Sequence, residues 1–319
     1  MVDSIEPGPI AMLRRTQLDM KLCETLALTI ALCLILLLLV AHPASAWGED
    51  GHRFINRVAA EKLPETAPQF LRNAADRLSF LGPEPDRWRD TRGTTRALAN
   101  GTAPDHFIDI DDQEFFKAMP TDRYLYSDWL RSKGKDPVKV GFLPYSMLEG
   151  YEKVMVLFRQ WRDPKNAAER QQFEQNIIAY AGILGHFVAD ASQPMHVTVN
   201  YNGWVTLPNP EGFTREPIHG KFESEYVKAR IKPEDFRSLV QPSRVLEDPF
   251  SEIKKYLFDS YAHVEELYRL DKKVRWDAAN TSPESKQFVA KRLAAGSQML
   301  SDLWYTAWVK SGEPAEPRH

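Results

Sequence analysis

The sequence contains few cysteines. Only two occur among its 319 residues, Cys23 and Cys33, and both lie near the amino terminus. The rest of the chain therefore offers no disulfide framework. It is long enough to bury a full hydrophobic core in one domain without cross-links.

An excess of basic residues is also missing. The chain has 41 lysines and arginines against 44 acidic residues, which gives a formal net charge of −3. This balance gives no support for tight binding to a nucleic-acid duplex through phosphate contacts. The overall charge leaves the substrate class open.

Alternating patterns typical of β-strands are lacking as well, and residues 203–207 are the one stretch compatible with a short strand. Hydrophobic residues recur instead at helical intervals over residues 147–161, 173–188, 250–268 and 289–307. Asp248-Pro249 and Ser282-Pro283 precede the last two segments as helix start signals. Residues 93–102 and 200–217 are rich in Gly, Pro, Asn and Thr and are expected to be loops. The pattern predicts an all-α, single-domain protein.

The amino-terminal segment has the features of a secretory signal peptide. Basic residues precede an apolar run at residues 26–41, and the run is followed by His42-Pro-Ala-Ser-Ala46. The run is short for a membrane span, which needs about 20 residues. We expect cleavage after Ala46 and export to the periplasm or beyond, with an uncleaved membrane anchor as the alternative. The predicted organisation is a signal peptide at residues 1–46, one domain at residues 47–310 and a disordered tail at residues 311–319.

Two pairs of metal-type residues are spaced four positions apart: His186 with Asp190, and His219 with Glu223. On a helix this spacing puts both side chains on one face, one turn apart, so that they can converge on one ion. Histidine and carboxylate ligands suit zinc or a similar ion. For one such pair alone, an ordinary surface or half-buried contact would be the better interpretation. His196 lies between the two pairs and adds a third segment.

The helix that carries His186 has two faces. Its expected core stripe consists of Phe173, Ile177, Tyr180, Leu184 and Val188. Small residues, Gly182, Gly185 and Ala189, surround His186 and Asp190 instead, and we expect them to leave room for a cavity. Pro194 should end this helix and turn the chain, so that His196 returns toward the same site.

Three further segments offer site residues. His106 lies among acidic and aromatic residues, in Asp105-His-Phe-Ile-Asp109. Asp86 lies beside arginines in Pro85-Asp-Arg-Trp-Arg89, a combination suited to holding a phosphate. Trp47-Gly-Glu-Asp-Gly-His52 follows the expected cleavage point, where a new amino group and its carbonyl can bind a metal together with His52.

These motifs occur in one order: Trp-Gly-x-x-Gly-His, Asp-His-Phe, His-Phe-x-x-Asp-x-x-x-Pro-x-His and His-x-x-x-Glu. In this combination the chain resembles the superfamily that joins single-strand-specific nucleases of the S1/P1 type with zinc-dependent phospholipases C. The motifs extend from Trp47 to Glu223. The resemblance implies an all-α catalytic domain with loops around a cleft that holds three zinc ions.

The resemblance also implies which residues hold each ion. The first zinc would be bound by Asp86, His106, His186 and Asp190, the second by His196, His219 and Glu223, and the third by Trp47, His52 and the shared Asp190. Trp47 would contribute its amino nitrogen and its carbonyl oxygen. Asp90 is an alternative to Asp86. We prefer Asp86 because the nucleases carry an arginine three positions after this ligand, and Arg89 fits that pattern.

The implied reaction is hydrolysis of a phosphate ester by a zinc-activated hydroxide. Asp86 would orient the attacking water or take its proton, Asp190 would hold two ions, and Arg89 would stabilise the added negative charge. Phe107 follows His106 and would stack on a base, with core packing as an equal alternative.

The choice of substrate rests on smaller differences. The spacing from Trp47 to His52 and the pair Gln193-Pro194 resemble the nucleases, whereas Glu223 resembles the phospholipases because nucleases usually carry aspartate there. A basic amphipathic helix for a lipid surface is missing. We therefore expect a monomeric nuclease and 3′-nucleotidase acting on single-stranded nucleic acid, with a phospholipase C as the alternative. A non-catalytic zinc-binding protein and a membrane-anchored helical protein are alternatives of another class.

Overall fold

The computed structural model describes residues 47–89, 92 and 96–314. The expected signal peptide, the alternative ligand Asp90 and the last five residues of the expected tail lie outside this part of the chain. Among the described residues, every helix is too short or too polar to cross a membrane.

The described residues form an all-α domain, as the sequence predicts. The helices are α2 (Gly48–Glu61), α3 (Gln69–Arg72), α4 (Ala75–Leu81), α5 (Glu84–Arg87), α6 (Ala97–Thr102), α7 (Gln113–Lys117), α8 (Arg123–Ser132), α9 (Pro137–Val140), α10 (Leu143–Arg162), α11 (Arg170–Ser192), α12 (Val227–Arg230), α13 (Pro249–Ala262), α14 (Val264–Lys273) and α15 (Pro283–Lys310). The stretch at residues 203–207 is not a strand in this structure, because the one β-type pairing there is an isolated bridge between Tyr201 and Gly203.

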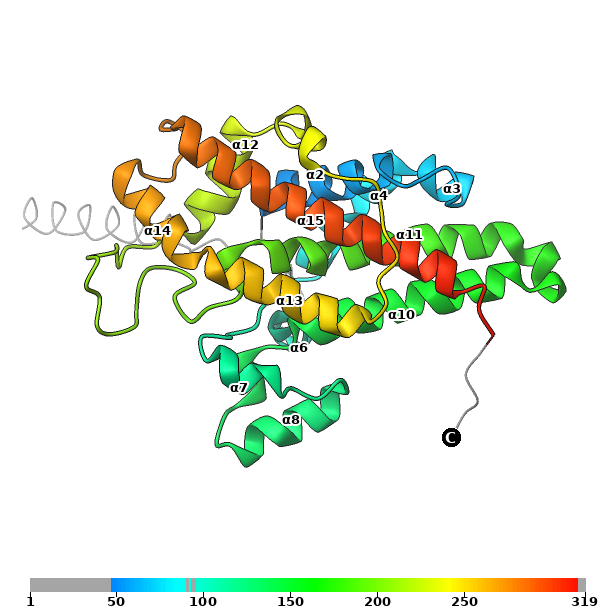
Figure 1. Cartoon of the computed structure of the whole chain (residues 1–319), viewed down its shortest axis with the longest axis horizontal. Helices are drawn as coiled ribbons and strands as arrows, with labels where there is room; N and C mark the ends of the chain where they lie inside the picture. The colour runs from blue at the N-terminus through cyan, green and yellow to red at the C-terminus, as the bar shows by residue number, and fades with distance from the viewer. Residues whose placement is uncertain (1–46, 90–91, 93–95, 315–319) are drawn as a thin grey trace, which may run out of the picture. The chain divides into compact units, whose positions relative to one another are not determined.

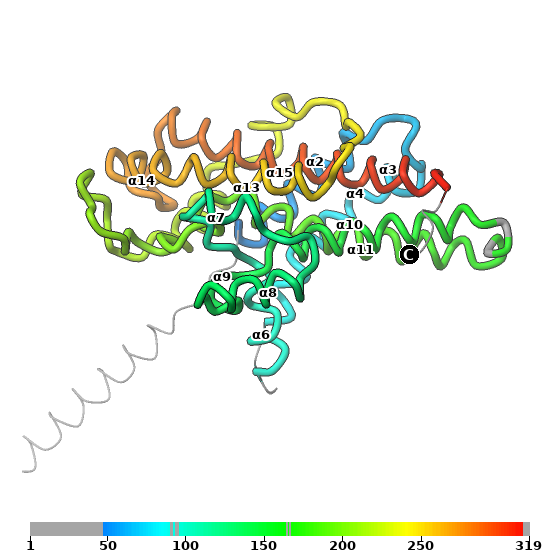
Figure 2. Tube along the Cα trace, turned by 60° about the horizontal axis from the view of Figure 1, so that its bottom comes forward, coloured from blue at the N-terminus to red at the C-terminus, as the bar shows by residue number. Residues whose placement is uncertain are grey.

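Helix α11 organises the domain. It runs antiparallel to α10, and the two lie side by side in both views (Figures 1 and 2). On its other sides α11 contacts α2, α4, α13 and α15. Every residue from 184 to 192 is buried as a result. The carboxyl-terminal half of α11 therefore holds its side chains in a densely packed environment.

Two helix starts agree with the sequence. The Asp248 side chain accepts a hydrogen bond from the Ser251 amide at 3.1 Å, and the Ser282 hydroxyl accepts one from the Ser285 amide at 3.0 Å. The periodic segment at residues 250–268 is not one helix, however. It divides at His263, where φ is −95° and ψ is 0°. These dihedral angles leave the helical region, so α13 and α14 are separate helices.

Helix α6 forms within residues 93–102, where a loop was expected. The turn-type residues of that stretch do not prevent a single short helix, because exposed glycine costs only about 1 kcal/mol. Residues 200–217 contain no α-helix, as predicted.

The small residues of α11 have a different role from the one expected. A Cβ atom at Gly185 would lie 1.9 Å from the Asn56 amide oxygen, and one at Gly182 would lie 2.5 Å from Leu81 Cβ. These glycines therefore allow α2 and α4 to pack against α11, and they do not leave a cavity. Tyr180 was expected in the core but is 44% exposed, whereas Ile177 and Leu184 of the same stripe are buried.

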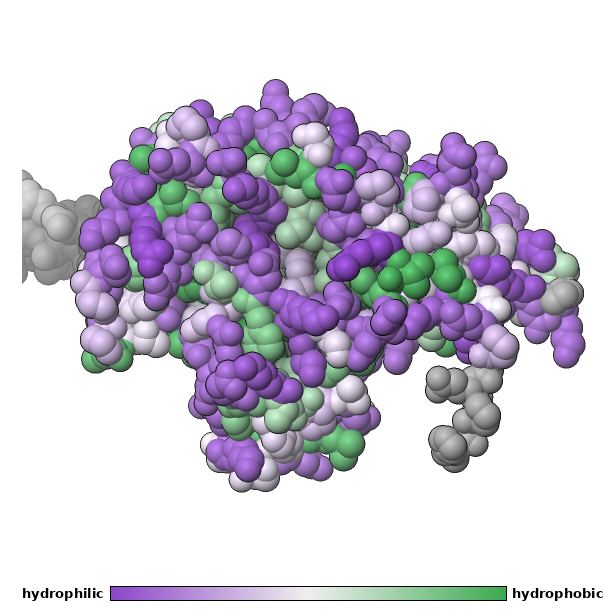
Figure 3. Space-filling view, in the orientation of Figure 1, coloured by the Kyte–Doolittle hydropathy of each residue, from purple (hydrophilic) through white to green (hydrophobic). Residues whose placement is uncertain are grey.

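The last helix, α15, ends at Lys310. Ser311 follows and is still buried, and its hydroxyl accepts a hydrogen bond from Arg162 Nε at 2.9 Å. The face shown in Figure 3 is mostly hydrophilic, with hydrophobic side chains in separate small groups. This distribution is typical of a surface that faces water over most of its area.

Candidate metal centre

The metal-type residues come from six short stretches of the chain. Helix α11 carries His186 and Asp190, and the 3₁₀ turn after it (Pro194–His196) carries His196. A π-helical turn (Lys221–Tyr226) carries Glu223, with His219 just before it. The others are His52 on α2, Asp86 on α5 and His106 at the end of the 3₁₀ turn Ala103–His106.

Asp190 joins three imidazoles from three of these stretches. Its Oδ1 lies 3.0 Å from His52 Nε2, and its Oδ2 lies 3.1 Å from His106 Nδ1 and 3.4 Å from His186 Nε2. The carboxylate is completely buried. A single buried carboxylate therefore lies at the centre of a ring of nitrogen atoms.

Asp86 completes this first group from the more open side. Its Oδ1 lies 3.8 Å from His106 Nδ1, 3.8 Å from His186 Nε2 and 3.5 Å from Arg89 Nη1. The same oxygen is buried and has no hydrogen-bond partner among the described residues. An acceptor in this position is suited to a cation that the neighbouring nitrogens share.

The second group contains His196, His219 and Glu223. Glu223 Oε2 lies 2.7 Å from His219 Nε2 and 3.7 Å from His196 Nε2. The two Nε2 atoms are 3.1 Å apart. Glu223 is fully buried, and its other oxygen, Oε1, has no partner within the described part of the chain.

Backbone carbonyls orient four of the five imidazoles. The Nδ1 atoms of His52, His186, His196 and His219 donate to the carbonyl oxygens of Gly48, Gly82, His106 and Tyr201, at distances of 2.8, 2.9, 2.6 and 2.7 Å. Each Nε2 then presents a lone pair to the centre, in the tautomer that metal ligation requires. Lone pairs that face one another or a carboxylate need a cation between them.

The electrostatics of both groups favour positive charge. Burial alone would raise the pKa of Asp190, but His186, His106 and His52 together hold it well below its ordinary value. Burial acts in the same way on Glu223, and its pKa is lowered on balance by His219 and His196. Both carboxylates are therefore ionised although they are buried. A buried ionised carboxylate is stable only beside a compensating cation.

Protons can supply part of this charge. Burial lowers the pKa of His52, but the hydrogen bond to Asp190 raises it on balance. His219 behaves in the same way beside Glu223. Burial instead holds the pKa of His186 well below its ordinary value, so this imidazole is neutral. A metal ion would satisfy all the lone pairs of one group at once, which separate protons cannot do.

The structure groups the residues into sets with all ligand atoms within 4.8 Å: His52, His186 and Asp190; Asp86, His106 and His186; and His196, His219 and Glu223. Every side chain expected to bind metal from the sequence thus belongs to one of these sets, and His196, His219 and Glu223 form a set of their own; metal binding by these residues stays a prediction. The division of the first group differs slightly, because His186 belongs to two sets.

Trp47 lies at the edge of this centre. Its indole nitrogen donates to the Ser192 hydroxyl at 2.7 Å, and its ring packs on Phe222 with centroids 5.4 Å apart. Its φ angle of 47° is left-handed, which is uncommon for a residue with a side chain and turns the chain sharply into α2. The indole therefore fixes the start of α2 against the end of α11, and His52 lies just over one turn further on.

Phe107 follows His106 but points to a neighbouring loop. A Cβ atom at Gly141 would lie 2.9 Å from Phe107 Cδ2, and Gly141 has a φ angle of 97°, which favours glycine. The Phe107 ring is half-buried. This contact provides a packing role, and stacking on a base stays a prediction.

Three polar residues near the ligands were not identified from the sequence. Gln193 Nε2 donates to Glu223 Oε2 at 3.2 Å, and Ser192 accepts the Trp47 indole. Asn56 Nδ2 donates to the carbonyls of Leu78 and Gly182 at 2.8 and 2.9 Å. No spacing rule distinguishes such amides and hydroxyls, although Gln193 was noted as a marker of the nuclease branch.

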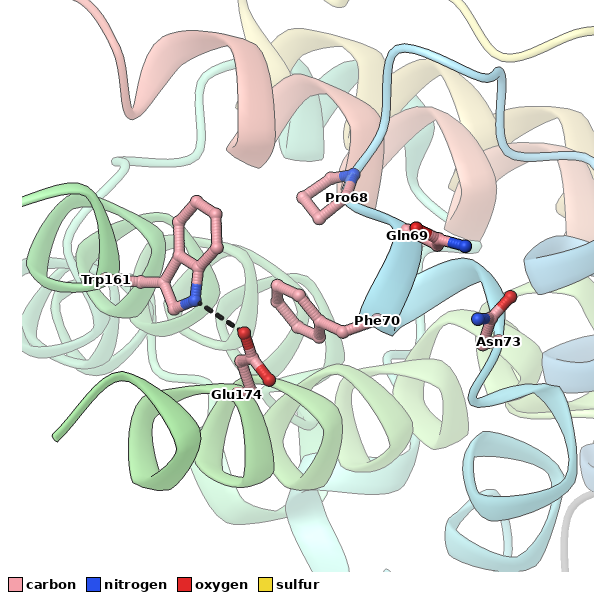
Figure 4. A pocket seen from close by; sticks show the side chains of 6 residues that line it. All are labelled: Pro68, Gln69, Phe70, Asn73, Trp161 and Glu174. Carbon is pink, nitrogen blue, oxygen red and sulfur yellow. Dashed lines mark hydrogen bonds between the residues drawn. The ribbon is translucent and has the colours of Figure 1, made fainter. Parts of the chain in front are cut away.

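Two pockets differ in how they relate to the metal-type residues. One is lined by residues that include Trp88, Asp105 and Phe187, and the Phe187 ring packs against His106 and His186 with centroids 5.6 and 5.4 Å apart. The other is shown in Figure 4 and lies between α3 and the α10–α11 pair; there Trp161 donates to Glu174 at 3.1 Å. None of the metal-type residues lines the second pocket.

Comparison with solved structures gives distant similarities. The alpha-toxin of Clostridium perfringens from an avian strain matches with 15% identity and a TM-score of 0.46, over 85% of this chain and 66% of the toxin chain. The alpha toxin of Clostridium absonum matches with 14% identity and a TM-score of 0.41, over 84% of this chain and 67% of that one. This chain thus spans about two thirds of the toxins' length. No curated protein matches the sequence.

The sequence also matches the model of a protein family. The model of the S1/P1 nuclease family matches residues 47–310. This range begins at the tryptophan before α2 and ends with α15, so it includes every element of the metal centre. The chain therefore belongs to the S1/P1 nuclease family.

Proposed function

We propose that this protein is an exported, zinc-dependent nuclease with 3′-nucleotidase activity that cleaves single-stranded nucleic acid. The observation that carries the proposal is the convergence of four imidazoles in a fixed tautomer on two buried, ionised carboxylates. Imidazole and carboxylate are the ligands that zinc prefers. The acceptors Asp86 Oδ1 and Glu223 Oε1, which lack partners among the described residues, fit the same interpretation.

Three zinc ions would be held by the ligand sets that the sequence implied. Asp86, His106, His186 and Asp190 would hold the first ion, and His196, His219 and Glu223 the second. The third would be held by His52, Asp190 and the amino nitrogen and carbonyl oxygen of Trp47. When bound, zinc supplies Lewis acidity and lowers the pKa of a water molecule to about 7.

The chain's own residues would then perform three tasks. Asp190 keeps the imidazoles of three segments at fixed distances. Asp86 is the more exposed carboxylate of its group and would orient the attacking water or accept its proton. Burial raises the pKa of Asp86, which suits a group that exchanges protons. Arg89, near Asp86, would stabilise the charge that develops on the phosphate.

Amino-terminal processing is part of the proposal. The third ion requires a free amino group at Trp47, and therefore removal of residues 1–46. Intact mass of the exported protein tests this requirement. A chain that begins at Trp47 agrees with it, whereas a full-length chain with three bound ions contradicts it.

A phospholipase C is the second candidate, and one observation favours it. Glu223 occupies a ligand position where nucleases usually carry aspartate, and it is buried between His219 and His196. The test offers the zinc-loaded protein four substrates in parallel: single-stranded DNA, RNA, a 3′-nucleotide and phosphatidylcholine.

We expect turnover of the two nucleic acids and the 3′-nucleotide. Cleavage of phosphatidylcholine alone would establish the phospholipase instead. If none of the four is hydrolysed by a protein that holds its metal, a zinc-binding protein without catalytic activity is the remaining interpretation. The chelator-treated protein serves as the control for contaminating enzymes.

A further inference from the structure

A group of charged and aromatic side chains lies on the surface formed by α2, α4 and α5. Phe80, at the end of α4, is 42% exposed. The guanidinium carbons of Arg53, Arg77 and Arg87 lie 5.5, 5.1 and 4.5 Å from the centre of its ring. We refer to these four residues as the Phe80 cluster. Three positive charges around one ring are well suited to cation–π contacts.

Two members of the Phe80 cluster are on helices that carry metal-type residues, and the other two, Arg77 and Phe80, are on α4. Arg53 follows His52 on α2, and Arg87 follows Asp86 on α5. Arg87 Nη1 also donates to the Phe80 carbonyl oxygen at 3.1 Å. Arg53 and Arg87 therefore hold the cluster in a fixed position relative to His52 and Asp86, because each arginine is next to one of these residues on the same helix.

The positive charge of the cluster is only partly compensated. Glu49 accepts from Arg53 Nη2 at 2.5 Å and from Arg87 Nη2 at 2.9 Å, so one carboxylate is shared by two guanidinium groups. Arg87 has a further contact with Glu84 at 2.9 Å. Arg77 forms no ion pair with any residue that the structure describes. The cluster thus combines an available guanidinium with an exposed aromatic ring.

We propose that the Phe80 cluster binds the nucleic-acid strand beside the bond that is cleaved, an inference that rests on the proposed function. The Phe80 ring would stack on a base, and Arg77 would contact a phosphate of the same strand. Aromatic rings and arginines together are the usual means of binding single strands without base preference. A nucleotide carries a flat base and an anion at adjacent positions, whereas a phospholipid headgroup has no flat base that could stack on the Phe80 ring.

Binding can be measured directly with the zinc-loaded protein. The probe is a fluorescent oligothymidylate with phosphorothioate linkages, which slow its hydrolysis, and the readout is fluorescence anisotropy. The variants are Arg77→Gln, Phe80→Ala and Phe80→Leu. Arg269→Gln is the matched control, because Arg269 is a half-exposed arginine on α14 that pairs with Glu265.

We expect Phe80→Ala to raise the dissociation constant about tenfold, which is the effect of losing one base–aromatic stack. Phe80→Leu should weaken binding to a similar extent, because leucine keeps an apolar side chain without the aromatic ring. If the alanine variant does not fold, the leucine variant still tests the stacking role of Phe80. A plot of the logarithm of the association constant against the logarithm of the salt concentration has a negative slope. Arg77→Gln should make this slope less steep by about 0.7, the value for one phosphate contact on a single strand. Arg269→Gln should bind as the wild type does.

Dissociation constants within twofold of the wild type for all the cluster variants would overturn the proposal, and so would failure of the wild type to bind the probe. If Arg77→Gln weakens binding to phosphatidylglycerol vesicles but not to the oligothymidylate, the cluster is a lipid contact and the proposal is wrong. Cleavage of a dinucleotide tests the proposed function separately. A protein that cleaves the dinucleotide while its cluster variants bind normally would disprove only the role of the Phe80 cluster.

Discussion

Replacing Asp190 with asparagine is the sharpest test of the metal centre. The substitution keeps the size of the side chain and removes its charge. In the structure Asp190 contacts three imidazoles at 3.0, 3.1 and 3.4 Å and is completely buried. An asparagine amide would instead donate to an imidazole lone pair, so the variant should fold while it loses its attraction for cations.

The magnitude follows from the number of contacts. Losing one charge-assisted contact to a reacting group costs about 3 kcal/mol, or about a hundredfold in rate. Asp190 is expected to serve two ions, so both should bind more weakly. We expect Asp190→Asn to lower kcat/KM by at least about a hundredfold and to lose at least one equivalent of zinc after dialysis against a limiting metal concentration.

The matched control is Asp302→Asn. Asp302 is also a buried carboxylate, and it accepts from the Arg244 amide and from Gln298 Nε2, both at 2.9 Å. The same chemical change there should lower stability and leave the zinc content unchanged. Elemental analysis and cleavage of a labelled oligonucleotide measure both variants. Full zinc content and activity within threefold of the wild type in Asp190→Asn would refute the reasoning.

Three other substitutions test separate parts of the structure. Gly185→Ala places a methyl group 1.9 Å from the Asn56 oxygen. The resulting overpacking should lower the free energy of unfolding by about 1–3 kcal/mol, measured by urea denaturation. An unchanged denaturation midpoint would contradict the close approach of α2 and α11. Arg89→Gln should lower kcat about a hundredfold with the zinc content unchanged, and a loss of zinc would show that Arg89 acts through Asp86. Burial, and after it the charge of Asp111, raises the pKa of Asp109 to about 7. The folded protein should therefore lose stability as the pH rises from about 4 to about 7, because only the unfolded state then ionises this carboxyl. Asp109→Asn should remove that loss, with a gain of at most about 4 kcal/mol at pH 8 and none below pH 4. A gain of equal size at both pH values would show that the effect is not electrostatic.

The sequence predicted the features that depend on local chemistry. Helical periodicity identified the long helices, and the caps at Asp248 and Ser282 were correct because a side-chain oxygen before a proline is a local signal. The four-residue spacing of His186 and Asp190 predicted their convergence, since it depends only on the geometry of one helix. The assembly of distant segments into one centre came from the order of the motifs.

The features that depend on contacts with neighbouring helices could not be predicted. Gly182 and Gly185 suggested a cavity, but their small size serves the approach of α2 and α4, which no pattern within α11 reveals. Tyr180 continued the hydrophobic stripe of α11 in sequence and is exposed in space, because periodicity within α11 does not show which part of its surface the neighbouring helices cover. The break at His263 has the same origin, since the hydrophobic spacing continues unchanged across it.

The orientation of the imidazoles is the part of the site furthest from any motif. The carbonyl groups of Gly48, Gly82, His106 and Tyr201 select the tautomer of four histidines, and every residue type possesses a carbonyl group. A motif therefore specifies which side chains can bind a metal, while the paths of α2, the turn after α4 and the loop before His219 decide whether their lone pairs converge. For this reason, changes that shift the backbone, such as Gly185→Ala on the face that meets α2, are expected to weaken metal binding without altering any ligand.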